Sequence, residues 1–83
     1  MEYTTTPVAK PPILARPAKI YRYVKPMMYA EKIKEIQRVL GVKPDGWYGA
    51  KTFNAVRVFQ RNENLVADGE VGPQTAARLG ISL

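Results

Sequence analysis

The sequence repeats itself at an interval of 23 residues, and this repeat limits the possible folds more than any other feature. "DGWYGAKT" begins at Asp45 and "DGEVGPQT" begins at Asp68. The same shift places Gly41 on Asn64, which are the two residue types that best tolerate a positive φ. The repeat therefore keeps a backbone conformation where it changes the side chain. The predicted unit is a helix, a left-handed cap, an apolar anchor, an Asp-Gly turn and the next helix.

Helical spacing of apolar residues predicts three helices, at about residues 30–40, at about 50–63 and from Pro73 to Gly80. Proline suits the first turn of a helix and glycine suits its end. The residues expected to face the core are Ile33, Ile36, Val39 and Leu40, then Phe53, Val56, Phe59 and Gln60, then Ala76 and Leu79. The prediction is an all-α fold, a small three-helix domain with an internal pseudo-repeat.

Polar residues shared by both repeats are expected to hold the turns. An Asp before Gly can accept hydrogen bonds from the amides of its own turn, while Gly supplies the positive φ. Gln37 and Gln60 are expected to satisfy backbone groups of a neighbouring loop. The predicted turn residues are Asp45, Gly46, Gly49 and Thr52 in the first repeat and Asp68, Gly69, Gly72 and Thr75 in the second. A catalytic carboxylate pair of the glycosidase kind is the alternative, and the identical role in both repeats favours turns.

The composition argues against an enzyme. The chain contains no Cys and no His, which removes the usual zinc ligands, the usual general base and the cysteine nucleophile. Its only Ser is Ser82, one residue from the end of the sequence. We therefore predict no catalytic residues, no metal and no cofactor.

Residues 1–27 differ in character from residues 28–83, and we predict an extended basic arm followed by the helical domain. The arm holds five prolines, which exclude a continuous helix, and its five basic residues face a single acid. Docking on its own domain and a solvated tail are the alternatives, but we expect the arm to bind a neighbouring chain. The expected contact residues form a β-prone stretch, Ile20, Tyr21, Arg22, Tyr23 and Val24.

The net charge of +6 favours polyanionic partners such as nucleic acid, an anionic cell-wall polymer or an acidic protein surface. Nucleic-acid binding through the arm is the less favoured of these, because charge alone is weak evidence. No apolar run reaches membrane-spanning length, and the N-terminus lacks the apolar core of a secretory signal. The expectation is synthesis in the cytoplasm, with delivery to the wall or to a larger particle by another route.

One family resemblance covers about residues 31–79. The sequence "IKEIQRVLGV…DGWYGAKTFNAVRVFQRNENLVADGEVGPQTAARL" resembles the three-helix peptidoglycan-binding domain family, which is commonly appended to cell-wall hydrolases, amidases and secreted metalloproteinases. The resemblance rests on two Asp-Gly-x-x-Gly-x-x-Thr segments that flank the "AVRVFQ" helix. It implies a compact three-helix fold and a non-catalytic role in holding the bacterial cell wall. The loop from Gly41 to Asp45 looks shorter than is usual in the family.

A peptidoglycan ligand offers sugar rings, acetamido groups and peptides with carboxylates, so its binder needs an exposed aromatic ring, hydrogen-bonding groups and positive charge. Trp47 is the leading candidate because its counterpart is Glu70, an exchange that a core position would not tolerate. Its alternative role is to cover the loop. Tyr48 corresponds to Val71, so we expect a core residue with its hydroxyl at the surface. The candidate ligand-binding residues are Trp47, Tyr48, Lys51 and Asn54.

Two settings fit these features. The first is a wall-binding module tethered through its arm to protein subunits of a larger assembly. The second is a structural protein of a bacteriophage virion that uses the fold as an assembly element. The two are compatible, since a virion can display a wall-binding domain. Fold alone does not decide between them.

Overall fold

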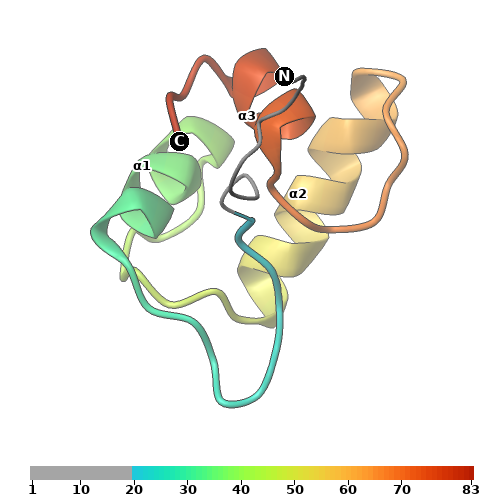
Figure 1. Cartoon of the computed structure of the whole chain (residues 1–83). Helices are drawn as coiled ribbons and strands as arrows, with labels where there is room; N and C mark the ends of the chain where they lie inside the picture. Colours follow the sequence, from blue (N-terminus) through green and yellow to red (C-terminus); the bar gives the residue numbers. More distant parts are fainter. Residues whose placement is uncertain (1–19) are drawn as a thin grey trace, which may run out of the picture.

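A computed structural model describes residues 20–83, which form three helices joined by long turns (Figure 1). Helix α1 spans Glu31–Leu40, α2 spans Ala50–Asn62 and α3 spans Pro73–Leu79. Within residues 20–83 there is no strand, only two isolated antiparallel bridges. The predicted all-α, three-helix fold is confirmed, and each predicted helix agrees with the observed one to within a residue at either end.

All three helices end in the same way, because a residue with positive φ follows each last turn. These residues are Gly41 (φ 77°), Asn64 (φ 59°) and Gly80 (φ 77°). The next residue then donates its N–H to a carbonyl five residues earlier, which is the Schellman arrangement. These bonds join Val42 to Gln37 (2.9 Å), Leu65 to Gln60 (2.8 Å) and Ile81 to Ala76 (2.9 Å). The left-handed caps predicted from the pairing of Gly41 with Asn64 are confirmed.

The core lies between the three helices and takes one inward stripe from each. Its buried apolar residues are Tyr21, Ile33, Ile36, Tyr48, Val56, Val71, Ala76, Leu79 and Ile81. Val39 was expected in the α1 stripe, but its side chain is 53% exposed. The expectation was wrong because Gln37, not Val39, completes the buried face that Ile33 and Ile36 begin.

The segment before α1, blue-green in Figure 1, packs on this chain's own domain. Tyr21 is only 6% exposed, and it exchanges two backbone hydrogen bonds with Val71 (3.0 and 2.7 Å). Tyr48 in turn donates its N–H to the carbonyl of Met28 (3.0 Å). Tyr21 is therefore a core residue and not a contact for a neighbouring chain. Within the described residues, packing on the domain extends back to Ile20, eight residues before the predicted boundary.

The rest of the predicted contact stretch is less buried. Ile20, Arg22 and Tyr23 are exposed, and Val24 is half-buried. The ring of Tyr23 lies 5.6 Å from that of Phe53 on α2, measured between centroids. Residues 1–19, the remainder of the predicted arm, lie outside the described part of the chain.

Two short pieces of this segment occupy equivalent places on the two turns. A Cβ atom added at Gly49 would lie 3.4 Å from the sulfur of Met27, and one added at Gly72 would lie 3.8 Å from Ile20. The turns are 23 residues apart, whereas Ile20 and Met27 are seven apart. The pseudo-symmetry of the fold thus extends to a segment whose sequence does not repeat.

The glycines with positive φ differ in what surrounds them, and this difference is testable. Gly41 (φ 77°) has no neighbouring atom within 4 Å of an added Cβ, whereas at Gly69 (φ 76°) that atom would collide with the Phe53 ring. We expect Gly41→Ala to lower the free energy of unfolding by about 1–2 kcal/mol, the cost of a left-handed backbone. Gly69→Ala should lower it by a further ~1–3 kcal/mol, because the ring must move. Urea denaturation measures both, and equal losses would contradict the steric argument.

Candidate functional site

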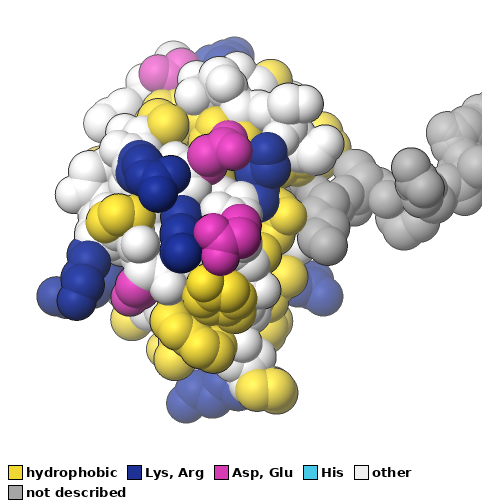
Figure 2. Space-filling view, turned by 90° about the vertical axis from the view of Figure 1, so that its left-hand side faces the viewer, with side chains coloured by type: hydrophobic (Ala, Val, Ile, Leu, Met, Phe, Trp, Pro, Cys, Tyr) yellow, Lys and Arg dark blue, Asp and Glu magenta, His cyan; other side chains and the backbone are white. Residues whose placement is uncertain are grey.

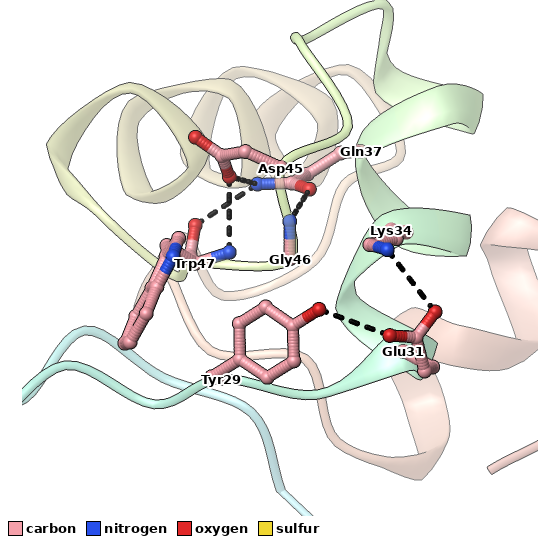
Figure 3. A network of polar contacts seen from close by, with 7 residues as sticks. All are labelled: Tyr29, Glu31, Lys34, Gln37, Asp45, Gly46 and Trp47. Carbon is pink, nitrogen blue, oxygen red and sulfur yellow. Dashed lines mark hydrogen bonds and ion pairs between the residues drawn. The ribbon is translucent and has the colours of Figure 1, made fainter.

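The first Asp-Gly turn is held by one buried amide (Figure 3). Gln37 on α1, 1% exposed, accepts the N–H of Gly46 at its Oε1 (2.9 Å). Its Nε2 donates to Asp45 Oδ1 (3.0 Å), to the carbonyl of Trp47 (2.9 Å) and to Thr52 Oγ1 (3.0 Å). An amide nitrogen has two hydrogens, so three acceptors must share them. A single side chain thus joins α1, the turn and the first turn of α2.

The second turn repeats this network around Gln60. Its Oε1 accepts the N–H of Gly69 (2.9 Å), and its Nε2 donates to Asp68 (3.0 Å), to the carbonyl of Glu70 (2.9 Å) and to Thr75 (3.1 Å). Every distance agrees with that of its counterpart in the first turn to within 0.1 Å. Both Gln residues therefore satisfy loop groups, as the sequence predicts.

The two Asp residues and the four turn glycines have separate roles in forming the turns and the helix starts that follow them. Asp45 Oδ1 accepts the N–H of Trp47, and Asp68 Oδ1 accepts that of Glu70, both at 2.9 Å. The hydrogen bonds from Trp47 and Gln37 hold the pKa of Asp45 below its ordinary value. The positive φ angles belong to Gly46 (84°) and Gly69 (76°), whereas Gly49 and Gly72 are extended residues that cap α2 and α3.

A pocket lies beside each network, and the two pockets are related by the repeat. The first has a volume of about 580 Å³ and the second about 210 Å³. Every residue that lines the first pocket, except Met27, has its counterpart 23 positions later in the lining of the second. Ile20 takes the place of Met27 there. The duplicated scaffold therefore forms a pocket with equivalent lining positions at each of the two turns.

The two pockets differ in charge and aromatic character at the positions whose side chains take no part in the hydrogen-bond network of the turn. The first pocket carries two lysines and an indole ring, whereas the second carries two carboxylates. The exchanges from first to second are Lys43 to Val66, Trp47 to Glu70 and Lys51 to Gln74. The first pocket is thus basic and aromatic, and the second is acidic. Only the first of these two matches a ligand that combines sugar rings with negative charge.

Trp47 is held at the surface by its neighbours. Its side chain is 47% exposed, and its ring packs edge-on against Tyr29 with 5.0 Å between centroids. Tyr29 donates its hydroxyl to Glu31 (2.9 Å), and Lys34 forms an ion pair with Glu31 (3.2 Å), as Figure 3 shows. The Tyr29 hydroxyl and Lys34 lower the pKa of the Glu31 carboxyl. The indole is therefore braced by Tyr29, which is itself held by Glu31 at the start of α1, while about half of the Trp47 side chain stays exposed.

The other candidates are placed differently. Tyr48 is completely buried and donates its hydroxyl to the carbonyl of Gly69 (2.6 Å), and this burial raises its pKa. The expectation that the Tyr48 hydroxyl lies at the surface is wrong, and Tyr48 cannot reach a ligand in this fold. Lys51 lines the first pocket, whereas Asn54 is exposed on α2 outside that lining.

Sequence reasoning missed three side chains at this site. Lys43 and Met27 line the first pocket, and Tyr29 packs on its indole. The mismatch of Lys43 with Val66 across the repeat was a usable signal, of the same kind that pointed to Trp47. Met27 and Tyr29 lie outside the repeat and gave no such signal.

The described surface shows neither a metal site nor a spanning helix. Within residues 20–83, acidic side chains do not gather in groups of three that could hold a metal ion. No helix of that same part is both long and apolar enough to cross a bilayer. On the face that bears α1, Lys and Arg are interspersed with Asp and Glu, and hydrophobic side chains gather toward its lower end (Figure 2).

A small three-helix scaffold with a pocket lined by an exposed indole is typical of a binding module. The chain belongs to the peptidoglycan binding domain family, whose model matches residues 30–79. It is 39% identical over 75 residues to the N-acetylmuramoyl-L-alanine amidase CwlL of Bacillus licheniformis, covering 76% of this chain and 21% of that protein. It is also 39% identical over 88 residues to the amidase CwlA of Bacillus subtilis strain 168, covering 92% of this chain and 32% of that protein.

A solved structure agrees with this assignment. The crystal structure of a peptidoglycan-binding protein from Clostridioides difficile, in complex with glutamine hydroxamate, matches with a TM-score of 0.69 and 35% identity. The match covers 76% of this chain and 41% of that one. The chain thus spans about a fifth to a third of the curated relatives described above.

The ionised form of Asp45 should stabilise the turn, and pH tests this. Asp45→Asn keeps an acceptor oxygen but removes the charge. Because the folded pKa lies below the ordinary value of 3.8, the contribution of the charge is complete above pH 3.8 and is lost as the pH falls through the folded pKa. The difference in free energy of unfolding between wild type and variant should be constant near neutral pH and shrink below pH 3.8. Urea denaturation across this range measures it; a difference that does not change with pH would contradict the argument.

Tyr48→Phe separates a core role from a ligand role. It removes the hydroxyl and leaves the buried carbonyl of Gly69 without this donor, so we expect a loss of about 1–3 kcal/mol in the free energy of unfolding. Peptidoglycan binding by the folded variant should equal that of the wild type. Urea denaturation and co-sedimentation with sacculi give the two values. Weaker binding at unchanged stability would return Tyr48 to the ligand site.

Proposed function

We propose that this chain binds bacterial peptidoglycan without catalysing a reaction, and that the contact is made at the first pocket. One observation carries the proposal: two pockets rest on the same hydrogen-bond network, and the first is larger and carries the exposed indole of Trp47 together with two lysines. An aromatic face can stack on the apolar face of a sugar ring, while lysines attract the carboxylates of the attached peptides.

The relatives support the same ligand. The two relatives described above are N-acetylmuramoyl-L-alanine amidases, and the protein of similar solved structure is a peptidoglycan-binding protein. This chain covers a minor part of each amidase, which fits a module joined to other parts that perform the reaction. Attachment of the module to a larger assembly through its N-terminal arm, with the buried Tyr21 excepted, is part of the proposal. The virion setting stays a prediction, since no described contact bears on it.

A binding role without catalysis is supported by what the polar residues of the site do. The chain has no His or Cys to act as base or nucleophile. The carboxylates of Asp45 and Asp68 accept hydrogen bonds within their own turns, each from a backbone N–H and a Gln amide. Their geometry serves the loops, and this makes them unsuited to act as a catalytic pair.

Trp47→Ala tests the site, and Glu70→Ala is its matched control at the equivalent position of the second turn. The full chain is mixed with purified peptidoglycan sacculi, and the fraction that pellets is measured against sacculus concentration. We expect Trp47→Ala to weaken binding by about tenfold or more, as loss of a central aromatic contact does. Glu70→Ala should leave binding unchanged.

Two further measurements keep this test decisive. Circular dichroism shows whether Trp47→Ala folds, because the variant loses the packing of the indole on Tyr29. Trp47→Phe retains an aromatic face and should recover part of the binding. Equal pelleting by wild type and a folded Trp47→Ala variant would place the contact elsewhere. If the wild type does not pellet at moderate salt, the proposed function is wrong.

A further inference from the structure

The pseudo-symmetry separates residues that hold the fold from residues that face a ligand. Both turns keep the Gln, Asp, Gly and Thr of the hydrogen-bond network, so these residues serve the scaffold. Lys43 and Lys51 line the first pocket, yet Val66 and Gln74 occupy the same places in the second. The second turn is built to the same distances without either lysine. Their charges are therefore not needed to form the turn.

Both lysines are available to an outside anion. The ion pairs found within residues 20–83 join Lys32 to Glu35, Lys34 to Glu31 and Arg78 to Glu63, so neither pocket lysine is engaged in one. The one carboxylate in the lining, Asp45, is attracted by the charge of Lys43 without forming an ion pair with it, and it already accepts hydrogen bonds from Trp47 and Gln37. The lining of the first pocket carries a net charge of +1, from two lysines and one Asp, whereas Asp68 and Glu70 give the second pocket −2.

The walls of the first pocket limit the kind of anion that fits. Beside the lysines lie the apolar side chains of Met27, Val42 and Ala50 and the indole of Trp47. A ligand that carries a charge next to aliphatic groups and a sugar ring satisfies all of these surfaces together. A phosphate polymer of the wall offers negative charge along its whole length and would leave the apolar wall unused. A peptide with a carboxylate offers both features.

Resting on the function proposed above, we infer that the first pocket recognises a free carboxylate on the peptide of peptidoglycan, and that Lys43 and Lys51 bind this carboxylate beside Trp47. The pocket therefore distinguishes between peptides of the wall: those whose carboxylates are blocked as amides bind more weakly than those whose carboxylates are free. The second pocket does not share it, because its acidic lining repels the same group.

The test uses the full chain and the fluorescence of Trp47, the only Trp in the sequence, as the reporter. Three soluble probes are titrated: a disaccharide-peptide with free carboxylates, the same compound with its carboxylates amidated, and the disaccharide without peptide. We expect amidation to weaken binding to the wild type by about tenfold, the size of one lost charge-assisted contact. Removal of the peptide should weaken it at least as much.

Substitutions that copy residues of the second pocket test whether the two lysines bind the carboxylate. Lys43→Val and Lys51→Gln each install the residue of the equivalent position, so the turn should still form. Each should bind the free carboxylate form about tenfold more weakly and discriminate less against the amide. Arg61→Gln is the control, because it removes the same charge from an exposed site near the other end of α2, and it should bind as the wild type does.

The outcomes separate this inference from the proposed function. If free and amidated compounds bind equally, or if both lysine variants bind as the wild type does, the carboxylate inference is overturned, while Trp47-dependent pelleting of sacculi would still stand. If walls that retain phosphate polymers are pelleted with the chain and stripped sacculi are not, the ligand is the phosphate polymer. If neither sacculi nor the soluble compounds bind, both proposals fail together.

Discussion

The fold depends on two buried glutamine amides. Burying an amide is costly unless its groups are paired, and both Gln37 and Gln60 are fully paired. Each one satisfies an N–H and a carbonyl of a turn that has no regular secondary structure, and each also contacts the helix that follows. Long turns would otherwise leave backbone groups without partners near the core. Because the partners lie on consecutive elements, one side chain fixes the position of the turn relative to both helices.

In this arrangement some turn residues contribute only backbone groups to the hydrogen-bond network, so their side chains are not needed for the fold. The network uses the N–H and the carbonyl of residue 47 and those of residue 70, but not their side chains. A Trp and a Glu can therefore stand on identical backbones. The scaffold tolerates such exchanges wherever a turn residue points outward. Binding chemistry can then change without any change in the hydrogen bonds that define the turn, which explains how one duplicated unit carries two pockets of opposite charge.

The sequence was sufficient for the features that are local and repeated. Helix ends and left-handed caps depend on residues within a few positions of one another, and the turn network joins residues at most 15 positions apart. The repeat showed each of these features twice. The burial of Tyr21 was not predicted, because its hydrogen-bond partner, Val71, is 50 residues away and no periodicity links the two residues. The hydroxyl of Tyr48 was placed wrongly for a related reason, since its acceptor on Gly69 comes near only after the second turn packs on the first. Exposure of Trp47 was predictable because the repeat offered a direct comparison with Glu70.

The two pockets differ in one further way that the repeat cannot supply. Met27 lines the first pocket and Tyr29 braces its indole, while Ile20 lines the second pocket. All three belong to the extended segment before α1, which contacts both turns although its own sequence does not repeat. A duplicated scaffold generates two equivalent sites unless something outside the repeat distinguishes them. Here that segment does so, because it brings a thioether and a phenol ring to one turn and an isoleucine to the other.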